Sequence, residues 1–114
     1  LMKRGWKKRK SATEGNRDLW DGLNALSDEV EQMAQQGLAN LGSVTNWQRS
    51  RLKGEKNLML IHANFNNDDL SLGIRNSGTQ AKISVSLRLS SNVNIYGLDQ
   101  LVDSLVAHLK MQMS

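Results

Sequence analysis

Apolar and polar residues alternate most regularly in the stretch 80–96, which reads QAKISVSLRLSSNVNIY. From Ala81 to Leu89 every second residue is apolar, and lysine, arginine or serine fills the positions between them. Successive side chains of a strand point to opposite faces, so this pattern predicts a strand with one apolar face and one basic, hydroxyl-rich face. We expect the rest of the chain to cover the first face or to extend the second.

Two earlier stretches, 57–65 and 70–75, show the same period of two and predict two more strands. Asparagine and aspartate occupy 66–69, and the sequence Asn-Ser-Gly-Thr occupies 76–79, so tight turns are expected there. After the third strand, Ser91-Asn92 makes either a bulge or a turn into a short fourth strand at 93–96. Connections this short predict an antiparallel meander of three or four strands.

A period of three and four predicts a helix on each side of the strands. The spacing of Ser11 and Glu14 suits a capping box for the first helix, but Gly15 and Asn16 weaken that start, so Thr13 or Asn16 is an alternative cap. The helix should end between 37 and 42. The second helix is predicted over 98–113. The fold class is therefore α+β: a helix, a three- to four-stranded antiparallel meander and a C-terminal helix, with both helices on one face of the sheet.

The apolar stripe of the first helix has two interpretations. Its spacing of four and three suits a helix packed on a sheet, and it is also the seam of a short coiled coil through which two copies could self-associate. The stripe residues, and hence the self-association candidates, are Leu19, Leu23, Leu26, Val30 and Met33.

Length and composition limit the classes of protein to consider. The 114 residues predict a basic flexible tail at 1–12 and a single α+β domain at 13–114. There is no cysteine, which excludes disulfides and thiolate zinc sites. The longest apolar run, 58–61, is far short of the ~20 residues that span a bilayer, and no apolar segment follows the basic start as in a signal peptide. We expect a cytoplasmic or nuclear protein.

The net charge of +4 is unevenly distributed. Six of the fifteen basic residues lie in the first ten positions, which leaves nine basic and eleven acidic residues in 11–114, a net charge of −2. Much of the basicity therefore belongs to the predicted tail, for which four roles remain open: a solvated tail, a nuclear-localisation cluster, a contact with an anionic membrane surface, and a contact with nucleic-acid phosphates. The candidate residues are Lys3, Arg4, Trp6, Lys7, Lys8, Arg9 and Lys10.

Two further groups of basic residues are candidates for binding nucleic acid. The segment 43–56 interleaves basic residues with a tryptophan, as in phosphate-and-stacking surfaces, although a connecting loop whose tryptophan packs at the core edge would look the same. The outward positions of the predicted strands combine basic residues with serines, which also suits a solvated sheet face or a dimer contact. The first group is Trp47, Arg49, Arg51, Lys53 and Lys56; the second is Arg75, Lys82 and Arg88.

No catalytic motif is present in the sequence. His62 and His108 are the only histidines, and neither lies in a nucleophile, phosphate-loop, dinucleotide or zinc-protease signature. The Asn66–Asp69 run lacks the alternating oxygen ligands and glycine of a calcium loop. We therefore expect no enzyme activity, no metal and no cofactor.

The predicted order of elements over about 16–113 is similar to that of the double-stranded RNA-binding domain and of the Alu-binding subunits of the signal recognition particle. Its strands-then-helix half resembles single-stranded-DNA-binding transcriptional coactivators that dimerise. The resemblance is one of order, and Gly97-Leu98-Asp99 stands where the first of these domains has a basic run. The expected function is non-enzymatic binding of nucleic acid, DNA or RNA, by a chain that could form a homodimer. The alternative is an assembly or adaptor protein whose tail contacts a membrane or an acidic partner.

Overall fold

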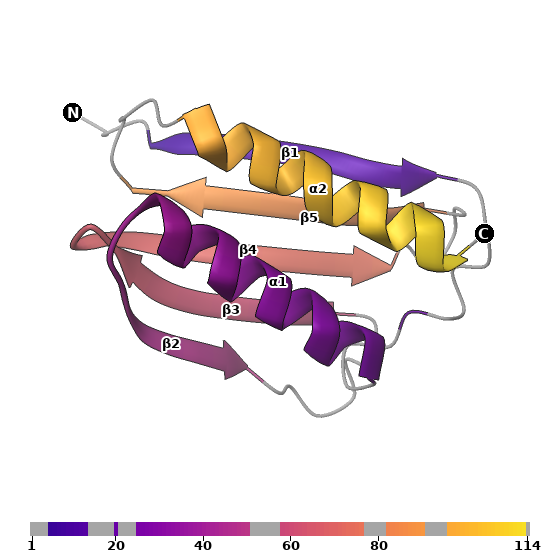
Figure 1. Cartoon of the computed structure of the whole chain (residues 1–114), viewed down its shortest axis with the longest axis horizontal. Helices are drawn as coiled ribbons and strands as arrows, with labels where there is room; N and C mark the ends of the chain where they lie inside the picture. The colour runs from indigo at the N-terminus through magenta and orange to yellow at the C-terminus, as the bar shows by residue number, and fades with distance from the viewer. Residues whose placement is uncertain are drawn as a thin grey trace.

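The computed structural model describes residues 5–13, 20, 25–50, 58–76, 82–90 and 96–113. Within them the chain forms, in order, β1 (Trp6–Thr13), α1 (Ala25–Leu41), β2 (Val44–Ser50), β3 (Leu58–Phe65), β4 (Asp68–Asn76), β5 (Lys82–Leu89) and α2 (Tyr96–Met113). The strands make one antiparallel sheet in the order β1-β5-β4-β3-β2. Both helices lie on the same face of this sheet, α2 over β1 and β5 and α1 beside it toward β2 (Figure 1). The predicted α+β class, the antiparallel pairing and the one-sided helices are confirmed.

The three inner strands follow the alternation in the sequence. Along β3, β4 and β5 the apolar positions are buried against the helices and the positions between them face away. α2 contributes the other side of the core, as its predicted stripe requires. Together, β3, β4, β5 and α2 provide most of the fully buried side chains: Met59, Ile61, Phe65, Leu72, Ile74, Ile83, Leu87, Leu98, Leu105 and Leu109.

The β3–β4 hairpin turns through Asn66 and Asn67, which both have positive φ angles, 50° and 69°. Two consecutive left-handed residues match the right-handed twist of a hairpin, and asparagine tolerates them. The turn is also tied to the start of β2, because the Asn66 side-chain oxygen accepts a hydrogen bond from the Ser43 amide at 2.9 Å. A Cβ at Gly42 would lie 2.7 Å from that asparagine side chain, so this contact needs glycine.

The sheet has five strands within the described residues, more than the three or four predicted, because two segments without clear alternation are strands. The first is β1, in which Trp6 to Thr13 pair along the whole of β5. The expectation of a flexible tail therefore fails for 6–12. The capping box fails too, because Ser11 lies inside β1 and its hydroxyl is 3.0 Å from that of Ser84.

The second unexpected strand is β2, at 44–50, where a connecting loop was expected. It pairs with β3 at the edge of the sheet, and its register shifts between Thr45 and Gln48 around Asn46, whose φ is 55°. This bulge explains why the segment has no regular alternation. Residues 51–57 lie outside the described part of the chain.

The helices agree with the prediction at their C-terminal ends. α1 ends at Leu41, just before Gly42, and its buried face includes Val30, Ala34 and Leu38. α2 begins at Tyr96, so this residue is helical and not the end of a fourth meander strand; 91–95 lie outside the described residues. A strand also precedes α1, so the helix-first order expected by resemblance to RNA-binding domains is not the order of this fold.

Candidate functional site

The register between β1 and β5 divides the basic run of β1 between the two faces of the sheet. Residues paired directly across an antiparallel ladder share a face. Lys8 pairs with Leu87 and Lys10 with Val85, both core residues, so these two lysines lie on the helix side. Lys7 pairs with Arg88 and Arg9 with Ser86, so they lie on the opposite face, which neither of the two described helices covers.

We call this uncovered face, formed by the outward positions of all five strands, the open face. The β4–β5 register adds Arg75, opposite Ser84, and the β1–β5 register adds Lys82, opposite Thr13. Four of its basic side chains are exposed and Lys82 is half-buried. None of them forms an ion pair with another described residue. The basic set of the open face is Lys7, Arg9, Arg75, Lys82 and Arg88.

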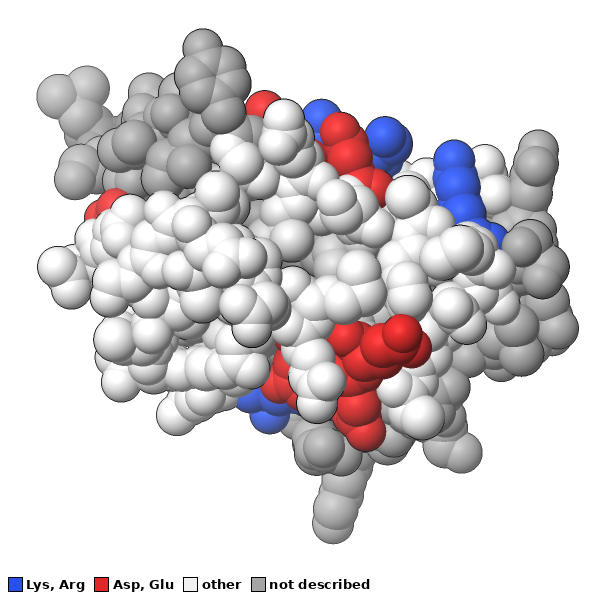
Figure 2. Space-filling view, viewed as in Figure 1, with Lys and Arg blue, Asp and Glu red and all other residues white. Residues whose placement is uncertain are grey.

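Acidic side chains are concentrated on the other side of the molecule. α1 carries Asp28, Glu29 and Glu31, and α2 carries Asp99 and Asp103. Figure 2 shows this helix side, where acidic side chains cluster near the first turns of α1 and alternate with basic ones along the β1 edge. On the open face, Asp69 is the one acid among the described strand residues. The two faces therefore differ in sign of charge.

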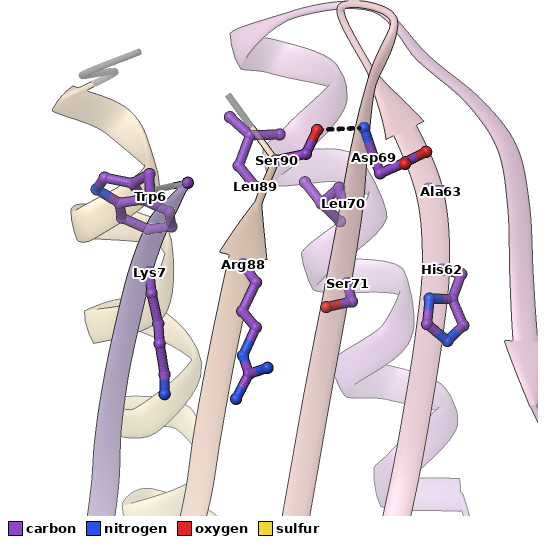
Figure 3. Close-up of a pocket in the computed structure, with 11 residues that line it drawn as sticks. Trp6, Lys7, His62, Ala63, Asp69, Leu70, Ser71, Arg88, Leu89 and Ser90 are labelled. Atoms are coloured by element: carbon purple, nitrogen blue, oxygen red, sulfur yellow. Dashed lines mark hydrogen bonds between the residues drawn. The ribbon is translucent and has the colours of Figure 1, made fainter. Parts of the chain in front are cut away.

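A shallow depression of about 750 Å³ lies at one end of the open face. Lys7, Arg88, Ser71 and His62 line it from β1, β5, β4 and β3, side by side across the sheet (Figure 3). At its rim the Asp69 amide donates a hydrogen bond to the Ser90 hydroxyl at 3.0 Å. This arrangement places two cations, a hydroxyl and an imidazole around one depression, with the acidic Asp69 at its rim. Two cations against one carboxylate give a positive balance that suits an anionic group.

The depression lacks the contacts of a nucleophilic active site. Ser71 pairs with His62 across β4 and β3, but no hydrogen bond links the two side chains. In Figure 3 the Ser71 hydroxyl points toward Arg88 and away from the imidazole. A serine nucleophile requires an adjacent base to take its proton, and that pairing is not formed here. Nor do the described residues include a group of three His, Asp or Glu side chains that could hold a metal ion.

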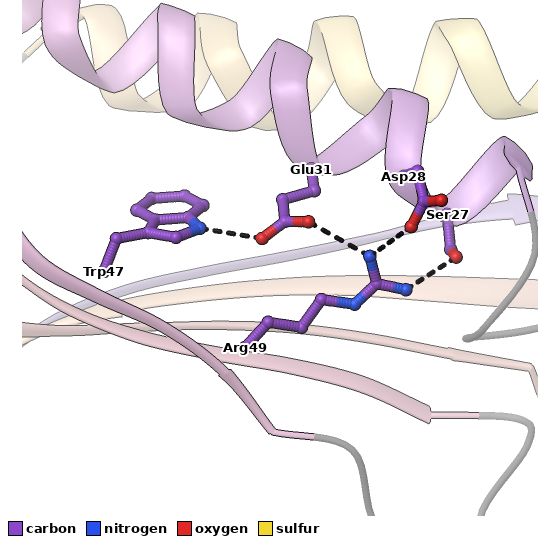
Figure 4. A network of polar contacts seen from close by, with 5 residues as sticks. All are labelled: Ser27, Asp28, Glu31, Trp47 and Arg49. Atoms are coloured by element: carbon purple, nitrogen blue, oxygen red, sulfur yellow. Dashed lines mark hydrogen bonds and ion pairs between the residues drawn. The ribbon is translucent and has the colours of Figure 1, made fainter.

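The predicted basic loop around Trp47 has a different environment from the open face. Arg49 pairs with Ile61 and points toward α1, where its guanidinium lies 2.6 Å from Asp28 and 3.0 Å from Glu31. It also donates to the Ser27 hydroxyl at 2.8 Å, and only 6% of its side chain is exposed. Trp47 donates from Nε1 to the second oxygen of Glu31 at 2.8 Å (Figure 4). Arg49 is therefore bonded to two carboxylates and joins β2 to α1, on the opposite side of the sheet from the open face.

Several other candidates lie away from the open face. Lys10 is one of them, and it donates to Asp103 of α2 at 3.1 Å. Trp6 packs against the core and also lines the depression at the end of the open face. Val30, a self-association candidate, is fully buried beneath α1, with Leu26 and Met33 packed against the same core. The candidates outside the described residues are Lys3, Arg4, Leu19, Leu23, Arg51, Lys53 and Lys56.

The structure adds residues that the sequence did not single out as site residues. His62 stands on β3, one strand in from the edge strand β2, and lies on the open face. Leu58 and Leu60 also face outward, half-buried, beside Arg75 and Gly73. The sequence indicated only that apolar residues occupy both faces of β3 near its start. It did not show which residues lie next to Leu58 and Leu60.

Comparison with known proteins does not identify a family. No protein-family model matches the chain, and no curated protein matches it significantly. Neither described helix is long and apolar enough to cross a membrane. The function is therefore argued from the geometry of the open face.

Proposed function

We propose that the protein binds the sugar–phosphate backbone of a nucleic acid on the open face of its sheet. The observation that supports this most directly is the set of five basic side chains on three adjacent strands, none of them in an ion pair with another described residue. Phosphate binding by such side chains releases condensed counterions and does not require displacing an internal carboxylate.

The surroundings of these side chains also suit a polyanion. Serine and glycine occupy the positions between them, so the surface stays low and hydroxyl groups are available to phosphate oxygens. The acids of α1 and α2 lie on the far side of the sheet, where they repel a phosphate chain from the helix face. This charge separation favours one orientation of the bound nucleic acid.

The alternative, assembly through the first helix, has less support. Val30 of its stripe is buried in the core, and the two sheet edges are poorly suited to pairing with another sheet. β1 carries four consecutive basic residues, Lys7 to Lys10, and β2 carries a bulge, features that discourage edge-to-edge pairing.

The salt dependence of binding tests the proposal. With up to five phosphate contacts, log K should fall with log salt concentration with a slope of about −3.5 for a single strand, at roughly 0.7 per contact. The double variant Lys7→Gln, Arg88→Gln should reduce the slope by about 1.4. The matched control Lys8→Gln, Lys110→Gln removes the same charge from the helix side and should leave the slope almost unchanged.

Three outcomes would overturn the proposal. The first is absence of binding to single- and double-stranded DNA and RNA at ~50 mM salt. The second is an equal reduction of the salt slope in the two double variants. Binding to vesicles of anionic lipid without binding to any nucleic acid would assign the open face to a membrane surface instead.

A further inference from the structure

The open face is divided lengthwise into a basic half and a neutral half. All five basic side chains stand on β1, β5 and β4. The outward positions of β3 are Leu58, Leu60, His62 and Asn64, and those of β2 include Gln48 and Ser50. Thus no lysine or arginine of the described strands lies on the β3–β2 half of this face.

The boundary between the halves is low and open. In the row that crosses the middle of the sheet, Arg9 is followed by Ser86, Gly73 and Leu60 on successive strands. Apart from its chain neighbours, the described atom within 4 Å of a Cβ built at Gly73 is Leu60 Cδ1, at 3.8 Å. Along this row a flat ligand can therefore extend from Arg9 to Leu60 over two small residues, whereas Leu58 stands opposite the exposed Arg75.

This division of the open face allows duplex and single-stranded nucleic acid to be distinguished as ligands. A duplex presents two phosphate lines with its bases enclosed, so a duplex on this face would place one phosphate line against leucines. A single strand has one phosphate line and bases that expose apolar faces on one side of it. The basic half matches the single phosphate line, and the half with Leu58, Leu60 and His62 matches the bases.

We infer that the open face binds single-stranded nucleic acid, with phosphates along β1 and β5 and bases over Leu58, Leu60 and His62. This inference rests on the proposed function. The basic track runs from the row of Lys7 and Arg88 to Lys82, six residues along β5, which is about 20 Å. Such a track accommodates a few nucleotides, near the lower end of the ~4–16 that other single-strand-binding domains occupy.

The test compares ligands that share phosphates but differ in bases. Fluorescence anisotropy would measure the affinity of the unmutated protein for a labelled single strand of about ten nucleotides, its blunt duplex and an abasic strand of equal length. The single strand should bind at least about fivefold more tightly than the abasic strand, the gain expected from contact with one base at the weak end of the range. It should also bind more tightly than the duplex.

A pair of variants assigns the difference to the leucines. Leu60→Gln removes apolar area that a base would cover, so it should weaken binding of the base-bearing strand about fivefold while leaving abasic binding and the salt slope unchanged. The control Met111→Gln replaces an exposed apolar side chain on the helix side and should change neither affinity. The ligand comparison on the unmutated protein remains decisive if Leu60→Gln does not fold.

The failures of the two proposals are distinguishable. Equal affinity for base-bearing and abasic strands, or a preference for the duplex, would overturn the single-strand inference and leave phosphate binding standing. Absence of binding to all three ligands would overturn both. Single-strand binding with no loss in Leu60→Gln would overturn the placement of the bases on β3.

Discussion

The two faces of this sheet are built from the same strands and differ in what happens to a charge placed on them. On the helix side, Arg49 is surrounded by Asp28, Glu31 and Ser27 and is almost fully buried. On the open face, Arg88 stands exposed beside Lys7 without a carboxylate partner among the described residues. One arginine stabilises the fold and the other remains available to a ligand. Residue type alone does not distinguish them; the neighbours supplied by the helices do.

β1 shows the same contrast within one strand. Lys10 reaches Asp103 of α2, whereas its neighbour Arg9 faces outward in a row with Ser86 and Gly73. Neighbouring residues of this basic run therefore differ in environment: Lys10 contacts a helix, and Arg9 extends the basic open face. Comparison of neighbouring residues on opposite faces is consequently the most direct way to test this interpretation.

The largest expected effect concerns the core. Leu72 and Ser71 are neighbours on β4 that face opposite sides. Leu72→Ala removes a buried side chain and should lower the free energy of unfolding by about 3 kcal/mol, whereas Ser71→Ala should change it by less than about 0.5 kcal/mol. Urea denaturation measures both; similar losses in the two variants would contradict the assignment of the faces.

The arginine pair gives the next effect. Arg49→Met leaves Glu31 half-buried with its Trp47 hydrogen bond but without a cation, and should cost about 2 kcal/mol of unfolding free energy. Arg88→Met should cost less than about 0.5 kcal/mol. The effects on nucleic-acid binding should be reversed, with Arg88→Met weaker and Arg49→Met unchanged at a temperature where it is folded. A loss of affinity in Arg49→Met equal to that in Arg88→Met would contradict the division.

As a control for charge, Arg49→Lys keeps the cation but loses the planar fork that reaches three partners at once. Its unfolding free energy should fall between those of the unmutated protein and Arg49→Met. Full stability in Arg49→Lys would show that charge alone holds β2 to α1.

The smallest expected effect is on the neighbouring residues of β1. Lys10→Gln removes an ion pair whose two side chains are 46% and 47% exposed, so the unfolding free energy should change by less than about 0.5 kcal/mol. Arg9→Gln should also leave stability nearly unchanged, but it should reduce the salt slope of single-strand binding by about 0.7. Equal slopes in the two variants would mean that β1 does not divide its charges between the faces.

Sequence pattern predicted the inner strands and the C-terminal helix because their periodicity is the direct result of burial on one side. The asparagine turn at 66–67 was equally readable, since few residues tolerate two positive φ angles in succession. The outer strands were not readable in this way. β1 buries Ala12 and packs Trp6 against the core, and between them its sequence is almost entirely basic. β2 interrupts its own alternation with a bulge.

The candidate site was predictable only in part for the same reason. Arg75, Lys82 and Arg88 were assigned to the outward face from alternation, and the structure places them there. The face on which each basic residue of β1 lies could be assigned only from the register between β1 and β5. A shift of one residue in that register would exchange the faces of Lys7 and Lys8. The environment of Arg49 could not be predicted without the position of α1, because its partners Asp28 and Glu31 lie 21 and 18 residues away in the chain.

The sequence by itself determined the α+β class, the apolar face of β3, β4 and β5, and the presence of outward basic residues, because these depend on local periodicity and burial. Tertiary structure alone decided that β1 joins the sheet, that Arg49 is bonded to Asp28 and Glu31, and that Lys7 and Arg9 extend the basic open face. These outcomes depend on pairing between segments far apart in the chain. That pairing is set by strand register and packing, and composition does not encode it locally.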